Sequence, residues 1–197
     1  MDRIEYYFTP HSPWTYLGHQ RLARIAERHG ARIEMKPCDY GRIFPATGGL
    51  PLPKRAPARQ AYRLVELQRW REVLGVELNL HPKHFPIDPT AASLAIIATL
   101  ALHGERAGYD FAGRLMRAVW VEERDIADED TLAAIATEAG LDARPILDGR
   151  AEAMPVYERN TDDALAAGVF GAPWYRLRDE GFWGQDRLDL LDRALAR

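Results

Sequence analysis

The sequence predicts an α/β protein in which the two ends of the chain build one sheet and a block of helices separates them. Short segments with strand-like patterns occur only near the N-terminus and near the C-terminus. Between Ala58 and about Ala167, apolar residues recur at helical spacing and no segment alternates convincingly. The chain has 197 residues, 47% of them hydrophobic and 28% charged, so it can bury a core without disulfides or structural metal.

The first 37 residues form a βαβ unit. Ile4 to Phe8 is a short buried strand that ends at Thr9-Pro10. A helix is expected from Pro13 to about Arg28, because its apolar residues have helical spacing and Gly30 follows as a stop signal. Ala31 to Pro37 alternates apolar and charged residues and predicts a second strand, and two strands joined in this way normally run parallel.

The middle of the chain is predicted to contain one long loop and then helices. Gly41 to Pro57 is rich in glycine and proline, and loops of that length are usually functional or mobile. Helices are then expected over about 58–74, 89–103, 107–123, 129–139 and 159–167, several of them followed by a glycine.

The C-terminal segment returns to strands. Trp174 to Leu177 and Gly181 to Trp183 predict a hairpin, and Arg187 to Arg197 predicts a closing amphipathic helix. The order βαβ, helices, ββα is that of a thioredoxin-like fold with a large all-helical insertion. We therefore expect residues 1–45 and 165–197 to form a discontinuous thioredoxin-like domain and residues 46–164 to form a helical insertion domain.

Composition excludes several classes of function. A net charge of −3 offers no basic field for a nucleic acid backbone. The single cysteine, Cys38, excludes an internal disulfide, a Cys-x-x-Cys pair and a four-cysteine zinc site. His81 and His84 lack a third ligand in a fixed arrangement, so we expect no metal. The longest apolar stretch, around 94–102, is too short to span a bilayer, and no signal peptide is evident, so we expect a cytoplasmic protein without a membrane partner.

Ser12-Pro13-Trp14-Thr15 stands between the first strand and the first helix, where thioredoxin-like folds carry a Cys-x-x-Cys pair. Serine followed by proline is an ordinary pair at the start of a helix. A hydroxyl at a helix N-terminus also has a chemical use, because it can donate a hydrogen bond to a thiolate that the helix dipole favours. With no second thiol in the chain, that thiolate would belong to a ligand.

Ala172-Pro173 precedes the third strand and has two interpretations. A cis peptide bond would turn the N–H and C=O of Ala172 outward to pair with a bound peptide. A trans proline would instead begin an edge strand.

Gly184-Gln185-Asp186 begins the last helix and suits an amino acid, since the helix N–H groups can hold a carboxylate and Asp186 an ammonium. Asp186 also fits a simple helix cap. Lys54, Arg55 and Arg59 form a basic cluster, which fits either a solvated face or an anion clamp.

Together these motifs resemble the 2-hydroxychromene-2-carboxylate isomerase family, which is related to kappa-class glutathione transferases and to the DsbA group. The matching segments are Tyr7 to Gly18, Gly168 to Pro173 and Phe182 to Leu188. The resemblance covers nearly the whole chain. Trp174 departs from the family pattern, which more often has a small or β-branched residue there, and we expect its bulk to reshape the substrate pocket.

The resemblance implies a glutathione-dependent isomerase that interconverts 2-hydroxychromene-2-carboxylate and trans-o-hydroxybenzylidenepyruvate, or a related small aromatic carboxylate, and that forms a homodimer. It implies that Ser12 stabilises the glutathione thiolate. The glutathione-binding residues that it implies or that the motifs suggest are Ala172, cis-Pro173, Gly184, Gln185, Asp186, Lys54 and Arg55. One alternative is a kappa-like glutathione transferase or peroxidase. The other is a noncatalytic thioredoxin-like binding module.

Overall fold

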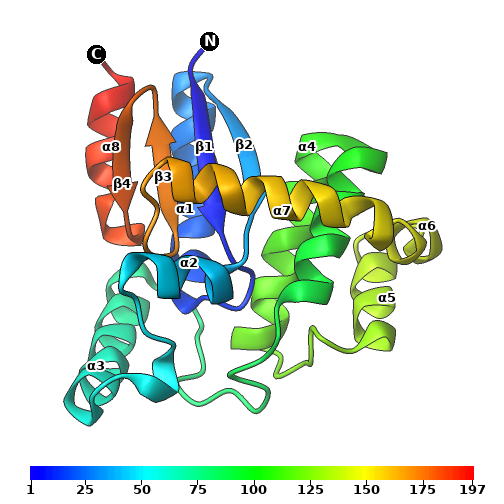
Figure 1. The fold of residues 1–197 in the computed structure, drawn as a ribbon, viewed down its shortest axis with the longest axis horizontal. Helices are drawn as coiled ribbons and strands as arrows, with labels where there is room; N and C mark the ends of the chain where they lie inside the picture. Colours follow the sequence, from blue (N-terminus) through cyan, green and yellow to red (C-terminus); the bar gives the residue numbers. More distant parts are fainter.

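Strands from both ends of the chain form one mixed four-stranded sheet in the computed structural model, which describes residues 1–197 (Figure 1). The strands are β1 (Arg3–Phe8), β2 (Arg32–Pro37), β3 (Trp174–Leu177) and β4 (Glu180–Trp183), in the spatial order β2-β1-β3-β4. β1 and β2 are parallel, whereas β3 is antiparallel to both β1 and β4. This confirms the predicted α/β thioredoxin-like sheet with helices inserted between β2 and β3.

The helices cover both faces of this sheet. In chain order they are α1 (Pro13–His29), α2 (Tyr40–Thr47), the 3-10 turn η1 (Leu52–Lys54), α3 (Pro57–Leu74), α4 (Thr90–Trp120), α5 (Glu129–Glu138), α6 (Ala143–Asp148), α7 (Arg150–Ala166), the 3-10 turn η2 (Gln185–Arg187) and α8 (Leu188–Leu195). Figure 1 shows α7 crossing one face of the sheet, with α1 and α8 on the other. None of these helices is both long and apolar enough to cross a bilayer.

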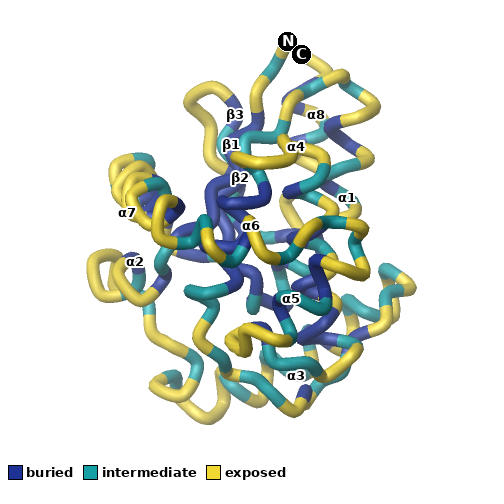
Figure 2. The backbone as a smooth tube through the Cα atoms, turned by 90° about the vertical axis from the view of Figure 1, so that its right-hand side faces the viewer, coloured by how far each residue is buried: buried dark blue, intermediate teal, exposed yellow.

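Alternation along β1 divides its side chains between two cores. Ile4, Tyr6 and Phe8 are fully buried in the larger core together with apolar residues of α1, α4 and α8. Tyr7 points to the opposite face and belongs to a smaller core beneath α2 and α7. Figure 2 shows the strands buried and the outer surfaces of α2 and α7 exposed. Because β1 is buried on both faces, its position is well defined, and the loop that follows it starts from a rigid part of the fold.

The predicted loop over 41–57 is wrong for its first half, because that segment contains the helix α2. Asp39 caps the helix by accepting a hydrogen bond from the Gly41 N–H at 2.7 Å. Tyr40 and Ile43 are buried in the smaller core. Pro45 lies inside the helix, and burial of one helix face overrides its unfavourable helix propensity.

The expected helix over 159–167 is also wrong in extent, since α7 begins at Arg150. Pro155 signals a break in the sequence. The helix continues through it because Ala153 and Tyr157 are buried against α4. The short helix α6 was not predicted. The two helices expected over 89–103 and 107–123 form one long element, α4, interrupted at Gly104, whose φ of 83° suits glycine.

The proposed domain boundaries fall inside elements, at α2 for residues 45 and 46 and at α7 for residues 164 and 165. The larger core combines residues from both predicted parts. The division into two domains stays a prediction.

Candidate active site

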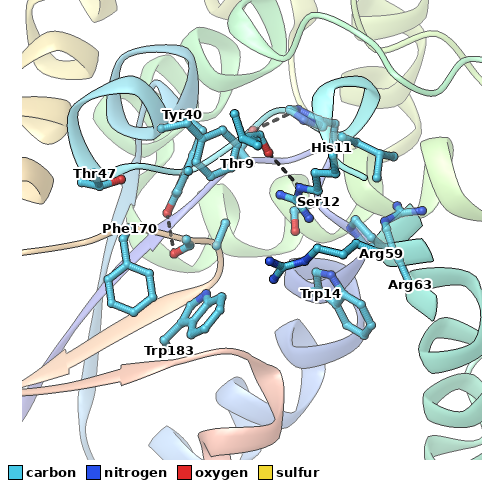
Figure 3. Close-up of a pocket in the computed structure, with 18 of the residues that line it drawn as sticks. Thr9, His11, Ser12, Trp14, Tyr40, Thr47, Arg59, Arg63, Phe170 and Trp183 are labelled. Carbon is cyan, nitrogen blue, oxygen red and sulfur yellow. Dashed lines mark hydrogen bonds between the residues drawn. The ribbon is translucent and has the colours of Figure 1, made fainter. Parts of the chain in front are cut away.

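A cavity of about 560 Å³ opens beside the C-terminal end of β1, where the loop before α1, the segment from α2 to α3, the segment before β3 and the end of β4 meet. Its polar lining includes Thr9, His11, Ser12, Tyr40, Arg55, Arg59 and Arg63, and its apolar lining includes Trp14, Phe44, Phe85, Phe170, Ala172 and Trp183. Figure 3 shows His11, Ser12, Arg59 and Arg63 on one side and Phe170 and Trp183 on the other. This volume is typical of a small-molecule site.

Ser12 lines the cavity at the N-terminus of α1. Its Oγ accepts a hydrogen bond from the Thr15 N–H at 3.3 Å, so the helix-cap interpretation of this serine is confirmed. The same geometry leaves the Ser12 O–H free, because no hydrogen bond of the structure uses it as a donor. A buried hydroxyl that caps a helix can therefore donate to an anion in the cavity at the same time.

The segment before β3 presents unpaired backbone groups to the cavity. The Ala172–Pro173 peptide bond is cis. Neither the N–H nor the C=O of Ala172 takes part in a hydrogen bond within the protein. The Tyr40 hydroxyl donates to the Gly171 carbonyl at 3.2 Å and holds the segment in place. A side chain at Gly171 is excluded, since its Cβ would lie 2.3 Å from Nε1 of Trp183. Ala172 can therefore pair with an extended ligand backbone.

Arginines of α3 and of the turn before it make this side of the cavity cationic. Arg55, Arg59 and Arg63 recur every four residues, and none forms an ion pair with a carboxylate. Arg55 is tied by Nε to the Leu50 carbonyl at 2.8 Å. Lys54, the other member of the predicted cluster, does not line the cavity. Arg63 was missed, although its spacing of four residues from Arg59 on one face of α3 was a usable signal.

His11 was also missed by the sequence analysis. Its Nδ1 lies 3.1 Å from the Thr9 Oγ1, and its ring packs against Phe85. Burial, opposed by Asp88 and assisted by the Arg63 charge, lowers the pKa of His11 to about 4. The imidazole is therefore neutral at physiological pH and can donate or accept a hydrogen bond.

The Gly184-Gln185-Asp186 motif lies at the start of η2 and does not line this cavity. Gln185 is buried, and its Oε1 accepts a hydrogen bond from Arg21 Nη1 at 2.8 Å. Asp186 pairs with Arg187 at 2.7 Å. Of the seven residues predicted to bind a cofactor, Arg55 and Ala172 thus line the cavity, and the roles of all seven stay predictions.

Aromatic residues form the rim near β4. Phe170 and Trp183 are in edge-to-face contact, with ring centroids 4.8 Å apart, and are 41% and 52% exposed. Trp174 does not itself line the cavity but packs edge-to-face against Phe170, which does, with ring centroids 5.0 Å apart, so the expectation that its bulk reshapes the pocket stays a prediction. The Trp174 ring also covers Gly181, where a Cβ would lie 2.4 Å from Trp174 Cζ2.

Comparison with known proteins shows the family to which this chain belongs. A model described as a DSBA-like thioredoxin domain matches residues 3–196. The chain belongs to the DSBA-like thioredoxin domain family. The recognised resemblance to 2-hydroxychromene-2-carboxylate isomerases is likewise confirmed across the whole length of the chain.

Three relatives illustrate this similarity. The chain is 30% identical over 199 residues to 2-hydroxychromene-2-carboxylate isomerase of Sphingobium xenophagum, covering 98% of this chain and 97% of the relative. A solved structure of 2-hydroxychromene-2-carboxylate isomerase has a TM-score of 0.82 at 27% identity, covering 99% of this chain and 95% of the other. Glutathione s-transferase kappa 2 of Caenorhabditis elegans is 23% identical over 205 residues, covering 98% and 91% of the two chains. The curated relatives of this DSBA-like protein thus include 2-hydroxychromene-2-carboxylate isomerases and kappa-class glutathione transferases.

Proposed function

We propose that this DSBA-like protein is a glutathione-dependent isomerase that interconverts 2-hydroxychromene-2-carboxylate and trans-o-hydroxybenzylidenepyruvate, or a related small aromatic carboxylate. The observation that carries the proposal is the free O–H of Ser12 at the N-terminus of α1, inside a cavity whose arginines lack carboxylate partners. Similarity to named isomerases over the whole chain supports the reaction class.

The residues of the cavity fit glutathione. The unpaired N–H and C=O of Ala172 match the backbone of a peptide-like ligand. Arg55 lacks a carboxylate partner and suits the glycyl carboxylate of the tripeptide, with Lys54 beside it in the sequence. In this proposal the γ-glutamyl end extends past the cavity lining to the motif Gly184-Gln185-Asp186, where Asp186 is exposed, and Pro173 fixes the direction of Ala172.

Glutathione, when bound, supplies a thiolate that adds reversibly to a conjugated carbon of the substrate, so that a double bond becomes single and can rotate. Ser12 donates its hydroxyl proton as a hydrogen bond to the thiolate and thereby favours the ionised sulfur. The N-terminus of α1 stabilises the same negative charge. The arginines orient an acidic substrate, and the aromatic rim covers its apolar part.

Replacement of Ser12 tests the proposal. We expect Ser12→Ala to lower the glutathione-dependent isomerisation rate by about a hundredfold, the effect of losing one preorganised donor to a developing anion. Calorimetric titration of glutathione, with the ultraviolet thiolate band followed in parallel, should show binding in both proteins and a weaker thiolate signal in the variant. Ser12→Thr, which keeps a hydroxyl, should retain most of the signal.

A matched control separates this role from helix capping. Asp128 caps α5 by accepting a hydrogen bond from the Thr131 N–H at 2.8 Å, and it is not among the residues that line the cavity. Asp128→Ala should cost about the same stability as Ser12→Ala, about 1 kcal/mol, and leave the rate unchanged. An unchanged rate in Ser12→Ala would exclude the proposed serine role. No binding of glutathione at millimolar concentration would favour a noncatalytic thioredoxin-like binding module.

Similarity to kappa-class glutathione transferases favours one alternative reaction on the same site, conjugation or peroxide reduction. The two functions differ in their products. Chromatography of the reaction mixture distinguishes a rearranged substrate from a glutathione adduct or from oxidised glutathione.

A further inference from the structure

The Arg63 guanidinium lies deep in the cavity wall without any hydrogen-bond acceptor from the protein. It lies over the ring of Phe85, with Cζ 5.1 Å from the ring centroid, and 5.8 Å from that of Trp120. Its Nη2 is buried and has no partner. A guanidinium carries five N–H donors, so the aromatic rings hold Arg63 while its hydrogen-bonding capacity remains unused.

No neighbouring group neutralises this charge. Arg55 and Arg59 carry the same sign, and His11 is neutral. Burial and the Arg55 charge lower the pKa of Arg63 to about 10, so the side chain is still a cation at physiological pH. Buried charges in proteins are normally paired, but Arg63 has no acceptor: its side chain lines the cavity while its Nη2 is covered by the protein. The missing partner is therefore an anion that enters from solvent.

The surroundings of Arg63 restrict what that anion is attached to. Phe85 contacts both Trp120, at 4.9 Å between ring centroids, and His11, at 6.0 Å. Phe85 and His11 form an aromatic wall of the cavity next to the guanidinium, and Trp120, which is fully buried and does not line the cavity, packs against Phe85. When a carboxylate binds the planar guanidinium through two hydrogen bonds, the group attached to that carboxylate lies along this wall. A flat conjugated group packs on such a surface better than a flexible chain.

We propose that Arg63 forms a separate carboxylate subsite that selects a co-substrate whose carboxylate is conjugated to a planar π-system. This inference rests on the proposed function in one respect. There Lys54 and Arg55 bind the glycyl carboxylate of glutathione, so the acid at Arg63 is a second ligand, the co-substrate. Arg63 is less exposed than Arg59 and Lys54, which are on the outer part of the same basic segment. The cavity thus binds two acids, each at its own cation.

Calorimetric titration with defined probes tests this subsite. The probes are trans-cinnamate, its uncharged analogue cinnamamide and the saturated acid 3-phenylpropionate, each with and without saturating glutathione. We expect the wild-type protein to bind trans-cinnamate about tenfold or more tightly than cinnamamide, as befits a hydrogen-bonded charged group. It should also bind trans-cinnamate more tightly than 3-phenylpropionate.

Substitutions then assign the preference to one side chain. Arg63→Met should abolish the preference for the acid and leave both cinnamamide and glutathione affinity unchanged. Arg63→Lys should keep only part of it, because an ammonium cannot bind both carboxylate oxygens in one plane. Arg69→Met removes the same charge from the same helix, but Arg69 is 60% exposed and pairs with Glu66, so the preference should survive.

Three results would overturn the subsite. They are unaltered binding of trans-cinnamate to Arg63→Met, equal weakening of trans-cinnamate and cinnamamide, and loss of glutathione binding with trans-cinnamate binding retained. The last result would assign Arg63 to glutathione and leave the proposed function intact. If the wild-type protein bound no glutathione but kept an Arg63-dependent preference, the subsite would stand and the proposed function would fail.

Discussion

The outer face of the sheet and the wall of the cavity handle buried charge in opposite ways. On the sheet face beneath α7, Glu5 of β1 accepts hydrogen bonds from Arg176 at 3.0 Å and from the Tyr7 hydroxyl at 3.3 Å. Nearby, Lys36 of β2 pairs with Asp163 of α7 at 2.7 Å. Each of these charges has a partner of the opposite sign.

In the cavity, Arg55, Arg59 and Arg63 have no such partner. Both regions belong to one chain with similar numbers of acidic and basic residues, so a general shortage of carboxylates does not explain the difference. Charges that join elements of the fold are neutralised within the fold. Charges that face a cavity remain available to a ligand, at a cost in stability that binding offsets.

The largest expected effect comes from breaking the paired region. Glu5→Leu removes the buried one of the two carboxylate partners of Arg176 and leaves the buried Tyr7 hydroxyl without its acceptor, so we expect the free energy of unfolding to fall by about 3 kcal/mol. Urea denaturation measures this change. Asp179→Ala is the control, because Asp179 pairs with the same Arg176 while fully exposed, and its loss should change stability by less than about 0.5 kcal/mol. Equal effects of the two substitutions would mean that burial of Glu5 is irrelevant.

Two histidines extend the comparison to pH. Burial lowers the pKa of both His11, in the cavity, and His19, in the core, from 6.5 to about 4. The unfolded chain therefore binds more protons between these values, so stability is highest above pH 6.5 and falls as the pH drops towards 4. Each ring contributes about 3 kcal/mol to this loss. Urea denaturation across this range should give a flatter profile for His11→Gln and for His19→Gln.

The two rings should differ once an anion enters the cavity. His19 is buried, its Nε2 lies 3.0 Å from the Tyr109 carbonyl, and it does not line the cavity that holds His11. Anion binding next to Arg63 should raise the pKa of His11 and leave that of His19 unchanged, as measured by NMR titration of the imidazole protons. Equal changes in the pKa of both histidines, or no change in either pKa, would contradict the contrast between cavity and core.

The smallest expected effect comes from removing a cavity charge. Arg63→Met replaces an unpaired cation by an apolar side chain of similar length next to Phe85 and Trp120. We expect the free energy of unfolding of the ligand-free protein to fall by less than about 1 kcal/mol or to rise. Thermal unfolding without added anions measures it. A loss as large as that of Glu5→Leu would show that Arg63 is a structural residue.

Local signals in the sequence determined much of the framework and part of the site. Ser12-Pro13 marked the start of α1, and alternation or aromatic content marked the strands, because a cap or a strand depends on residues that are neighbours in the chain. The same reasoning failed in the segment that holds α2. There Gly41 and Pro45 suggested a loop. The segment is a helix because Tyr40 and Ile43 are buried against residues that are distant in the sequence.

The environment of the polar and charged residues was decided by the tertiary structure. Gln185 was predicted to bind a ligand, and the structure shows that it is buried with its amide oxygen accepting a hydrogen bond from Arg21, 164 residues away, so that prediction stays untested. His11 carried no distinct local signal, and Arg63 carried only its spacing of four residues from Arg59. Their environment depends on packing beside Phe85 and, for Arg63, on the lack of an acceptor, properties that arise only when α3 and the loop before α1 come together around one cavity. Backbone preferences act over a few residues, whereas solvent exclusion and charge pairing depend on every element packed nearby.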